Sequence, residues 1–157
     1  MKEGHSSAAN AADREIAVTR IFNAPRELVY KVWTDPNHIA LWWGPKGFTN
    51  TIEKMEVKPG GVWLFVMHGP DGLDYPNKVV YLEVKKPERL VYDHGDKGEP
   101  NYHRVTVTFE KIGKTTKVSM TMLFTTAEHR NEVVEKYNAV EGLNQNMDKL
   151  AAYLLKM

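Results

Sequence analysis

The sequence predicts an α+β fold in which a curved antiparallel sheet of about seven strands wraps around a long C-terminal helix. Two observations carry this prediction. Between Phe48 and Phe124, strand-like runs alternate with short turn segments rich in glycine, proline and aspartate. Short connections of this kind join antiparallel neighbours, because parallel strands need long crossovers. The last part of the chain changes to a helical period of apolar residues, which provides a cover for the apolar face of the sheet.

The first elements are a strand and two short helices. The segment from Glu15 to Phe22 is rich in β-branched residues and is predicted as the first strand. Apolar residues at helical spacing then predict a helix that ends at Thr34, with Asn23 as its expected cap. Asp35 followed by Pro36 predicts a second helix start, because a capping side chain precedes proline at the first helical position.

Residues 42–45 (WWGP) end the second short helix. Adjacent tryptophans stopped by Gly-Pro predict an apolar corner or lid seated against the sheet rather than a catalytic motif. About six strands are expected after this corner, which gives about seven in all.

The chain ends in two predicted helices. The longer one carries a single apolar stripe at offsets of three, four and seven, formed by Val140, Leu143, Met147, Leu150, Ala151 and Leu154. A shorter helix from about Ala127 to Tyr137 precedes it, with Thr126 as cap and Val133, Val134 and Tyr137 facing inward. Gly142 costs about 1 kcal/mol relative to alanine inside a helix, so a close backbone approach or a bend is expected there.

Composition limits the function. The 157 residues fit one globular domain, predicted over residues 14–157 after a disordered tail over residues 1–13. The 21 basic and 20 acidic residues are interspersed and give a net charge of +1, which argues against nucleic acid or an anionic membrane as partner. The absence of cysteine excludes disulfides and thiolate metal sites. No apolar run is long enough to span a membrane and no secretion signal is present, so a cytoplasmic location is expected.

Strand alternation predicts which side chains face the C-terminal helix. Trp63, Phe65 and Met67 share one face of their strand. The other inward sets are Leu90, Tyr92 and His94, then His103, Val105, Val107 and Phe109, and finally Val118, Met120 and Met122. These aromatic and methionine side chains either fill a solid core or line a cavity, and the alternation is compatible with both.

His94 and His103 form the sharpest local pattern. If the turn centres on Gly98 and Glu99, the two histidines lie directly opposite each other on neighbouring strands. Such a pair either hydrogen-bonds a ligand, transfers a proton or has a structural role. A zinc site normally has at least three protein ligands, and no third ligand is evident, so no metal or other cofactor is predicted.

Glu83 raises a question of register. Val80, Leu82 and Val84 form the more apolar set of their strand, so alternation places them inside and Glu83 in solvent. The alternative is an inward Glu83, which would be a candidate general acid or base.

From about Glu15 to Met157 the chain resembles the family of activator-of-heat-shock-protein-90-ATPase homologues, in the START-like, birch-pollen-allergen-like (SRPBCC) superfamily. The resemblance rests on residues 22–25 (FNAP), 32–34 (VWT), 42–45 (WWGP), 59–61 (PGG) with the following Trp63, Phe65 and Met67, 69–72 (GPDG), 87–90 (PERL) and 141–150. It implies the helix-grip fold, in which a curved sheet surrounds a long C-terminal helix. The superfamily includes ligand carriers, cyclases, hydrolases and chaperone partners.

Two positions depart from the pattern of this family. Leu143 stands where the family commonly has an aromatic residue, so more room is expected between helix and sheet. His94 stands where similar sequences often carry tryptophan, so a cavity, if present, is expected to be more polar than in the family.

The functional hypothesis is the binding of a small hydrophobic or amphipathic molecule between the curved sheet and the C-terminal helix. The predicted ligand-binding residues are Trp63, Phe65, Met67, Tyr92, His94, His103, Val105, Met120, Leu143 and Met147. Asn144, at the margin of the helix stripe, either presents an amide to the ligand or, as is more usual for a marginal polar residue, faces water.

Two alternative functions remain open at this point. One is a protein-interaction module that acts on a chaperone ATPase, which an exposed apolar patch around Trp42 would favour. The other is a cavity enzyme that uses Glu83 or the histidine pair as acid or base.

Overall fold

The computed structural model describes residues 13–96, 99 and 102–157. The tail predicted over residues 1–13, apart from Asp13, lies outside the described residues. The same holds for most of the turn predicted around Gly98.

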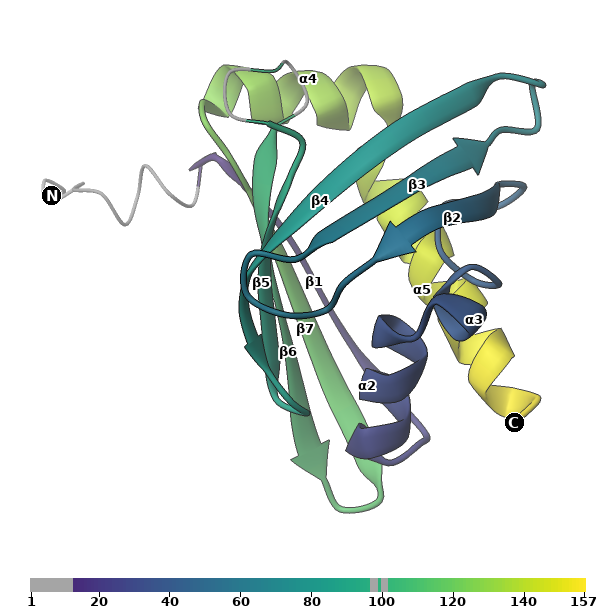
Figure 1. Ribbon diagram of the computed structural model, residues 1–157. Coiled ribbons are helices and arrows are strands. Elements are labelled where there is room, and N and C mark those ends of the chain that lie inside the picture. The colour runs from purple at the N-terminus through teal and green to yellow at the C-terminus, as the bar shows by residue number, and fades with distance from the viewer. Residues whose placement is uncertain (1–12, 97–98, 100–101) are drawn as a thin grey trace, which may run out of the picture.

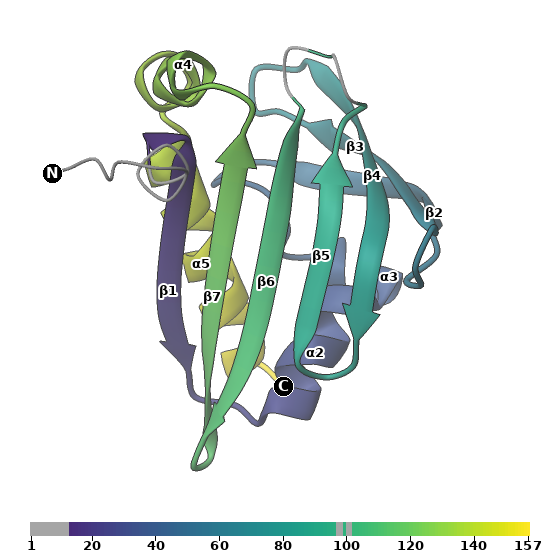
Figure 2. The same ribbon diagram turned by 90° about the vertical axis from the view of Figure 1, so that its left-hand side faces the viewer.

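Seven antiparallel strands form one sheet in the order β1-β7-β6-β5-β4-β3-β2, as Figure 2 shows for its larger part. From β2 onward each strand pairs with the next one along the chain, and β1 pairs with β7. The predicted antiparallel meander and the predicted first strand are therefore confirmed. The strands are β1 (Glu15–Phe22), β2 (Thr49–Met55), β3 (Val62–His68), β4 (Asp74–Lys85), β5 (Arg89–His94), β6 (His103–Ile112) and β7 (Thr115–Phe124).

The sheet curves around helix α5 (Ala139–Leu155), which lies behind the strands in Figure 2. Helix α4 (Ala127–Tyr137) lies across one end of the sheet, and α2 (Arg26–Thr34) and α3 (Pro36–Ile39) lie toward the other end (Figure 1). This is the α+β helix-grip architecture that the sequence predicts. None of the helices in the described part of the chain has the length and apolar composition that crossing a membrane requires.

The helix starts follow the predicted capping chemistry with one exception. The Asp35 carboxylate accepts a hydrogen bond from the Asn37 amide at 2.9 Å, and the Thr126 hydroxyl accepts one from the His129 amide at 3.0 Å. The cap predicted at Asn23 is wrong. Helix α2 begins directly after Pro25, which occupies the cap position in an extended conformation without a side-chain cap, so Asn23 precedes the helix by too many residues.

The paired tryptophans form the predicted corner. Trp42 is fully buried and Trp43 nearly so. The Trp42 ring meets Trp33 of α2 edge to face, with centroids 5.0 Å apart, and its indole N–H donates to the Val32 carbonyl at 3.1 Å. Trp43 meets Trp63 of β3 at 5.3 Å. The corner therefore joins the two short helices to the sheet.

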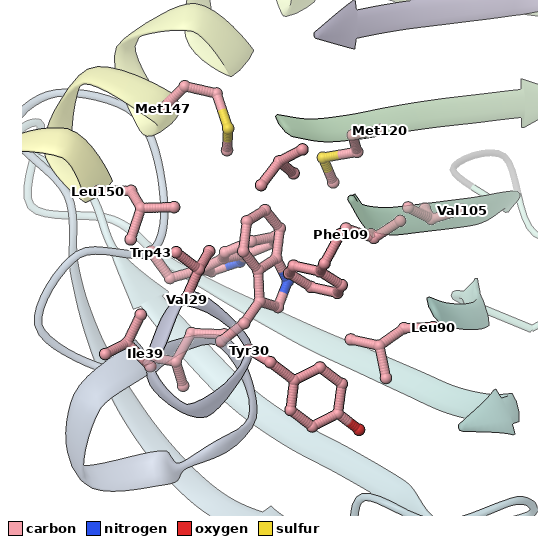
Figure 3. Close-up of a cluster of buried hydrophobic side chains, with 14 of the residues drawn as sticks. Val29, Tyr30, Ile39, Trp43, Leu90, Val105, Phe109, Met120, Met147 and Leu150 are labelled. Carbon is pink, nitrogen blue, oxygen red and sulfur yellow. The ribbon is translucent and has the colours of Figure 1, made fainter. Parts of the chain in front are cut away.

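The core between α5 and the sheet is solid in the half of the helix nearer the C-terminus. Figure 3 shows Met147 and Leu150 of α5 facing a cluster that includes Phe109 and Met120 of the sheet. Met147 and Leu150 are almost completely buried. Burial of each such side chain stabilises the fold by about 1.5–3 kcal/mol, so this half of the helix anchors α5.

Strand β4 does not follow the predicted alternation. Val79 and Tyr81 are buried, whereas Leu82 is 40% exposed, so the prediction that Val80 and Leu82 face inward is wrong. The cause is an irregularity in the pairing with β5 directly after Tyr81. Such a bulge moves the following residues to the opposite face, and Val84 then packs against the core.

Glu83 lies in solvent, as the preferred interpretation of the sequence predicts. Its side chain is 48% exposed and forms an ion pair with Arg89 at 3.2 Å. The alternative of an inward Glu83 that acts as acid or base in the cavity is wrong.

The loop of residues 43–48 is tied to α5 by polar side chains of the helix. The Gly44 amide donates to the Asn146 side-chain oxygen at 3.1 Å, and the Lys46 amide donates to the Gln145 side-chain oxygen at 3.2 Å. The first of these bonds is buried. These contacts fix where the helix lies relative to the tryptophan corner.

Lys149 is the charged helix residue that also contacts the loop of residues 43–48. Its ammonium group donates to the carbonyls of Pro45 at 3.2 Å and Phe48 at 3.1 Å, and lies 3.5 Å from that of Trp43. Burial lowers the pKa of Lys149, because the charged form loses water. We call the contacts of Gln145, Asn146 and Lys149 with residues 43–48 the loop clamp.

We predict that Lys149→Met weakens the loop clamp. The variant should lose about 1–2 kcal/mol of unfolding free energy, because loop carbonyls lose a charged donor. Amide hydrogen exchange at Gly44 and Lys46 should become faster, whereas the control Lys156→Met, at an exposed position at the end of α5, should leave both rates unchanged. Unchanged exchange at Gly44 in Lys149→Met would show that the clamp does not depend on this lysine.

Candidate functional site

A cavity of about 200 Å³ lies between α5, the loop clamp and the inner face of the sheet. Apolar side chains dominate its wall, and its polar members are uncharged or histidine. The residues that line it are Trp43, Gly44, Pro45, Met67, Tyr92, His94, His103, Val105, Met120, Met122, Tyr137, Ala139, Gly142, Leu143 and Asn146.

Most of the predicted ligand-binding residues line this cavity, namely Met67, Tyr92, His94, His103, Val105, Met120 and Leu143. They come from β3, β5, β6, β7 and α5, which are adjacent only in the folded sheet and helix. The alternation of inward and outward side chains along each strand was therefore enough to predict the strand residues of the cavity wall.

Trp63, Phe65 and Met147 are buried but do not line the cavity. The rings of Trp63 and Phe65 stack on each other with centroids 4.2 Å apart, and Trp43 lies against Trp63. Met147 belongs to the solid part of the core in Figure 3. Alternation identifies inward side chains, but it does not distinguish those that meet a void from those that meet another ring.

His94 and His103 pair across β5 and β6, as predicted. Their rings lie 4.9 Å apart and are tilted by 32°. His103 also stacks on Phe124 of β7 at 4.9 Å, and His94 meets Phe65 of β3 edge to face at 6.3 Å. The two histidines are thus central members of an aromatic row that crosses the sheet.

The protonation state of His94 follows from its contacts. Its Nε2 lies 2.7 Å from the Asn77 side-chain oxygen, and the Asn77 amide nitrogen donates to the Tyr75 carbonyl at 2.8 Å. The Asn77 oxygen therefore accepts, so His94 carries its proton on Nε2. Burial, and secondarily the neighbouring His103, lowers the pKa of His94 to about 3. At neutral pH the ring is uncharged and Nδ1 is its acceptor atom.

Tyr92 supplies a second polar group in the wall. Its side chain is 1% exposed, and its hydroxyl has no hydrogen-bond partner among the residues that the structure describes. Burial raises the pKa of Tyr92, so the hydroxyl stays protonated and can both donate and accept. Buried hydroxyls are nearly always paired, which makes this one an exception that needs an explanation.

Asn146 is a cavity residue that the sequence interpretation missed. Its side chain is buried, its oxygen accepts from Gly44, and it lines the cavity. The spacing contained a signal, because Asn146 lies three residues after Leu143 on the inward stripe. Asn144, the amide at the margin of the stripe, does not line the cavity and lies toward Arg20, with its side-chain oxygen 3.4 Å from the guanidinium.

The junction of α4 and α5 borders the cavity. Tyr137 lines it and is 68% exposed, so the prediction of an inward, buried Tyr137 is wrong. Tyr137 is the last residue of α4 and precedes Asn138, whose left-handed conformation (φ 53°) turns the chain into α5. Gly142 faces Pro45 here, and an added Cβ would lie 3.6 Å from the proline ring, which is an ordinary van der Waals contact, so the expected close backbone approach is not observed.

On the surface, hydrogen bonds join a hydroxyl, a histidine and a carboxylate in the same order as in a catalytic triad. The Thr51 hydroxyl lies 2.7 Å from His68 Nε2, and His68 Nδ1 lies 2.7 Å from the Asp74 carboxylate. Both contacts are exposed, and none of the three residues lines the cavity. We assign these bonds a role in linking β2, β3 and β4. Across the described residues, no group of three or more histidine and acidic side chains forms a metal-binding arrangement.

A larger groove of about 920 Å³ lies beside α2, α3 and β4. Charges of both signs border it, from Glu27, Lys31, Asp35 and Lys86, and among its lining residues only Tyr30 is buried. The smaller cavity under α5 therefore remains the stronger candidate for a ligand site, because buried apolar walls with a few polar groups are typical of such sites.

The fold has several close structural relatives. A protein from Arthrobacter aurescens aligns with a TM-score of 0.86 at 22% identity and covers 94% of this chain and 90% of its own. A protein from Nitrosomonas europaea gives 0.82 at 21% identity, with 92% and 96% covered. The AHSA1 protein from Silicibacter pomeroyi gives 0.71 at 20% identity, with 90% and 97% covered. Identities this low show a shared fold and leave function open.

No curated protein matches this chain. Residues 23–155 match the family described as Activator of Hsp90 ATPase homolog 1-like protein. This range contains the tryptophan corner, the cavity wall and all of α5. The chain therefore belongs to the Activator of Hsp90 ATPase homolog 1-like protein family, as its motifs predicted.

Proposed function

We propose that this protein binds a small hydrophobic or amphipathic molecule in the cavity under α5. The observation that carries the proposal is the cavity itself, whose wall is mostly apolar and includes a few polar residues, namely Tyr92, His94, His103 and Asn146. Concave apolar sites with a few polar groups are typical of small-molecule binding.

The wall of the cavity supports the same proposal. Met67, Met120 and Met122 give it side chains that adapt to differently shaped apolar ligands. Transfer of an apolar ligand from water to this wall provides the driving force. At about 200 Å³ the cavity lies below the roughly 300–1,000 Å³ of sites for drug-sized molecules, so the ligand is small.

The interaction-module alternative finds less support. Trp42, around which an exposed apolar patch would have favoured it, is fully buried. For the enzyme alternative, Glu83 is no longer a candidate acid or base in the cavity, because its side chain lies in solvent and pairs with Arg89. The histidine pair remains inside the cavity, where it contributes to the polarity of the wall.

The first test asks whether the cavity retains a molecule. We expect native mass spectrometry of the purified protein to show a non-covalent adduct, and Leu143→Phe to lose it, because the larger ring fills the space that Leu143 leaves. The control Leu82→Phe, on the outer face of the sheet, should keep the adduct. Solvent extraction of the wild type would identify the released compound. An adduct that persists unchanged in Leu143→Phe would place the ligand elsewhere.

The second test uses stability. In protein refolded without ligand, Tyr92→Phe should raise the unfolding free energy by about 1 kcal/mol, because it removes an unpaired buried hydroxyl. The control Tyr153→Phe removes a hydroxyl that lies 2.7 Å from His38 Nδ1, so it should lower stability or leave it unchanged. Chemical denaturation measures both variants. A Tyr92→Phe variant less stable than the wild type would mean that the hydroxyl has a partner in the folded protein.

A further inference from the structure

We propose that the cavity recognises a carbonyl group of an uncharged apolar ligand, and that the donor is the side-chain amide nitrogen of Asn146. This inference rests on the proposed function, and it adds the chemical class of the ligand. Asn146 is 6% exposed and lines the cavity from helix α5. It therefore places a buried polar side chain in a wall that is mostly apolar.

The bond to Gly44 fixes the orientation of the Asn146 amide. A backbone N–H only donates, so the Asn146 atom that lies 3.1 Å from the Gly44 nitrogen is the side-chain oxygen. Turning the amide over would place two donors against each other. The oxygen is thus occupied in the loop clamp, and the nitrogen with its two protons is the polar group that remains.

The Asn146 nitrogen is both unpaired and accessible. No residue in the described part of the chain accepts a hydrogen bond from it, since the bond from Gly44 is the one that this side chain makes. The nitrogen also retains accessible surface, which distinguishes it from the Tyr92 hydroxyl, an unpaired atom with essentially none. Because Asn146 lines the cavity and is otherwise buried, a molecule in the cavity can reach this nitrogen.

The chemistry of the wall then selects among acceptors. The amide nitrogen offers only donors, so the ligand must supply an acceptor. Among the described residues that line the cavity there is no aspartate, glutamate, lysine or arginine, so a carboxylate would be buried without a counterion. A carbonyl oxygen accepts from Asn146, carries no charge and brings no proton that needs a partner of its own. The site therefore favours a small ketone or ester.

The test compares acetophenone with isopropenylbenzene, in which a methylene group replaces the carbonyl oxygen, so the two probes have nearly the same shape. Each probe is titrated into ligand-free refolded protein and followed by NMR of the Met67, Met120 and Met122 methyl groups. The ratio of the two dissociation constants should change by about tenfold against acetophenone in Asn146→Leu, because the donor is removed. The control Gln145→Leu removes a loop-clamp bond outside the cavity wall and should keep the wild-type ratio.

A second readout uses the wild-type protein, since Asn146→Leu also removes the acceptor of the Gly44 amide. The side-chain NH₂ signals of Asn146 are assigned by their absence in Asn146→Asp, which keeps an acceptor for Gly44. These signals should move downfield when acetophenone binds and much less when isopropenylbenzene binds, because only the ketone accepts a hydrogen bond.

The outcomes separate this inference from the proposed function. A ratio that stays unchanged in Asn146→Leu, or a ketone that shifts the Asn146 signals no more than the hydrocarbon does, would overturn the carbonyl assignment and leave a ligand cavity. Benzoate is the charged probe, and tighter binding of benzoate than of acetophenone would overturn the uncharged class. Binding of none of the three probes would overturn both this inference and the proposed function.

Discussion

The loop clamp is the constraint on which the cavity depends. Helix α5 is anchored by Met147 and Leu150 in a solid core, and the clamp ties the next part of the helix to the tryptophan corner. Beyond the clamp, toward the start of the helix, Leu143 and Gly142 face the cavity. The helix thus has a packed half and a half that stands over a void, with Asn146 at the boundary between them. The buried bond from the Gly44 amide to Asn146 holds this part of the helix against the loop of residues 43–48.

The sheet provides a rigid wall opposite the helix. The aromatic row that contains His94 and His103 spans β3 to β7, and Asn77 holds His94 in one tautomer. An uncharged His94 and a protonated Tyr92 make the wall polar without making it charged. This agrees with the departure of His94 from the family pattern, where a histidine in place of tryptophan predicted a more polar cavity. Among the described residues that line the cavity there is no aspartate, glutamate, lysine or arginine.

The sequence predicts local features of this molecule well. Strand β1, the strand count, the tryptophan corner and the facing of His94 and His103 all follow from alternation, turn chemistry and capping. Two of the failures have non-local causes. The bulge after Tyr81 reverses the faces of β4 without a marker in the segment itself. Tyr137 is exposed because of how α4 meets α5, and that depends on tertiary packing.

The strand residues of the candidate site could be predicted from the sequence, whereas Asn146 of the helix and the presence of a cavity could not. Met67, Tyr92, Val105 and Met120 were identified because every second strand residue faces the helix. Asn146 was missed, since a polar residue in an apolar stripe is easily assigned to solvent. Whether inward residues surround a void depends on how far α5 stands from the sheet. The loop clamp sets this distance through contacts between residues about a hundred positions apart.

Xenon binding tests the central claim, that α5 stands over a void, most directly. Xenon enters apolar cavities without needing a specific partner. In ligand-free protein with ¹³C-labelled methionine methyl groups, the account predicts xenon-dependent shifts at Met67, Met120 and Met122, which line the cavity. Met55 and the exposed Met157, which do not line it, should shift little. Absence of shifts at all three cavity methionines would mean that the helix closes on the sheet and that the protein has a solid core there.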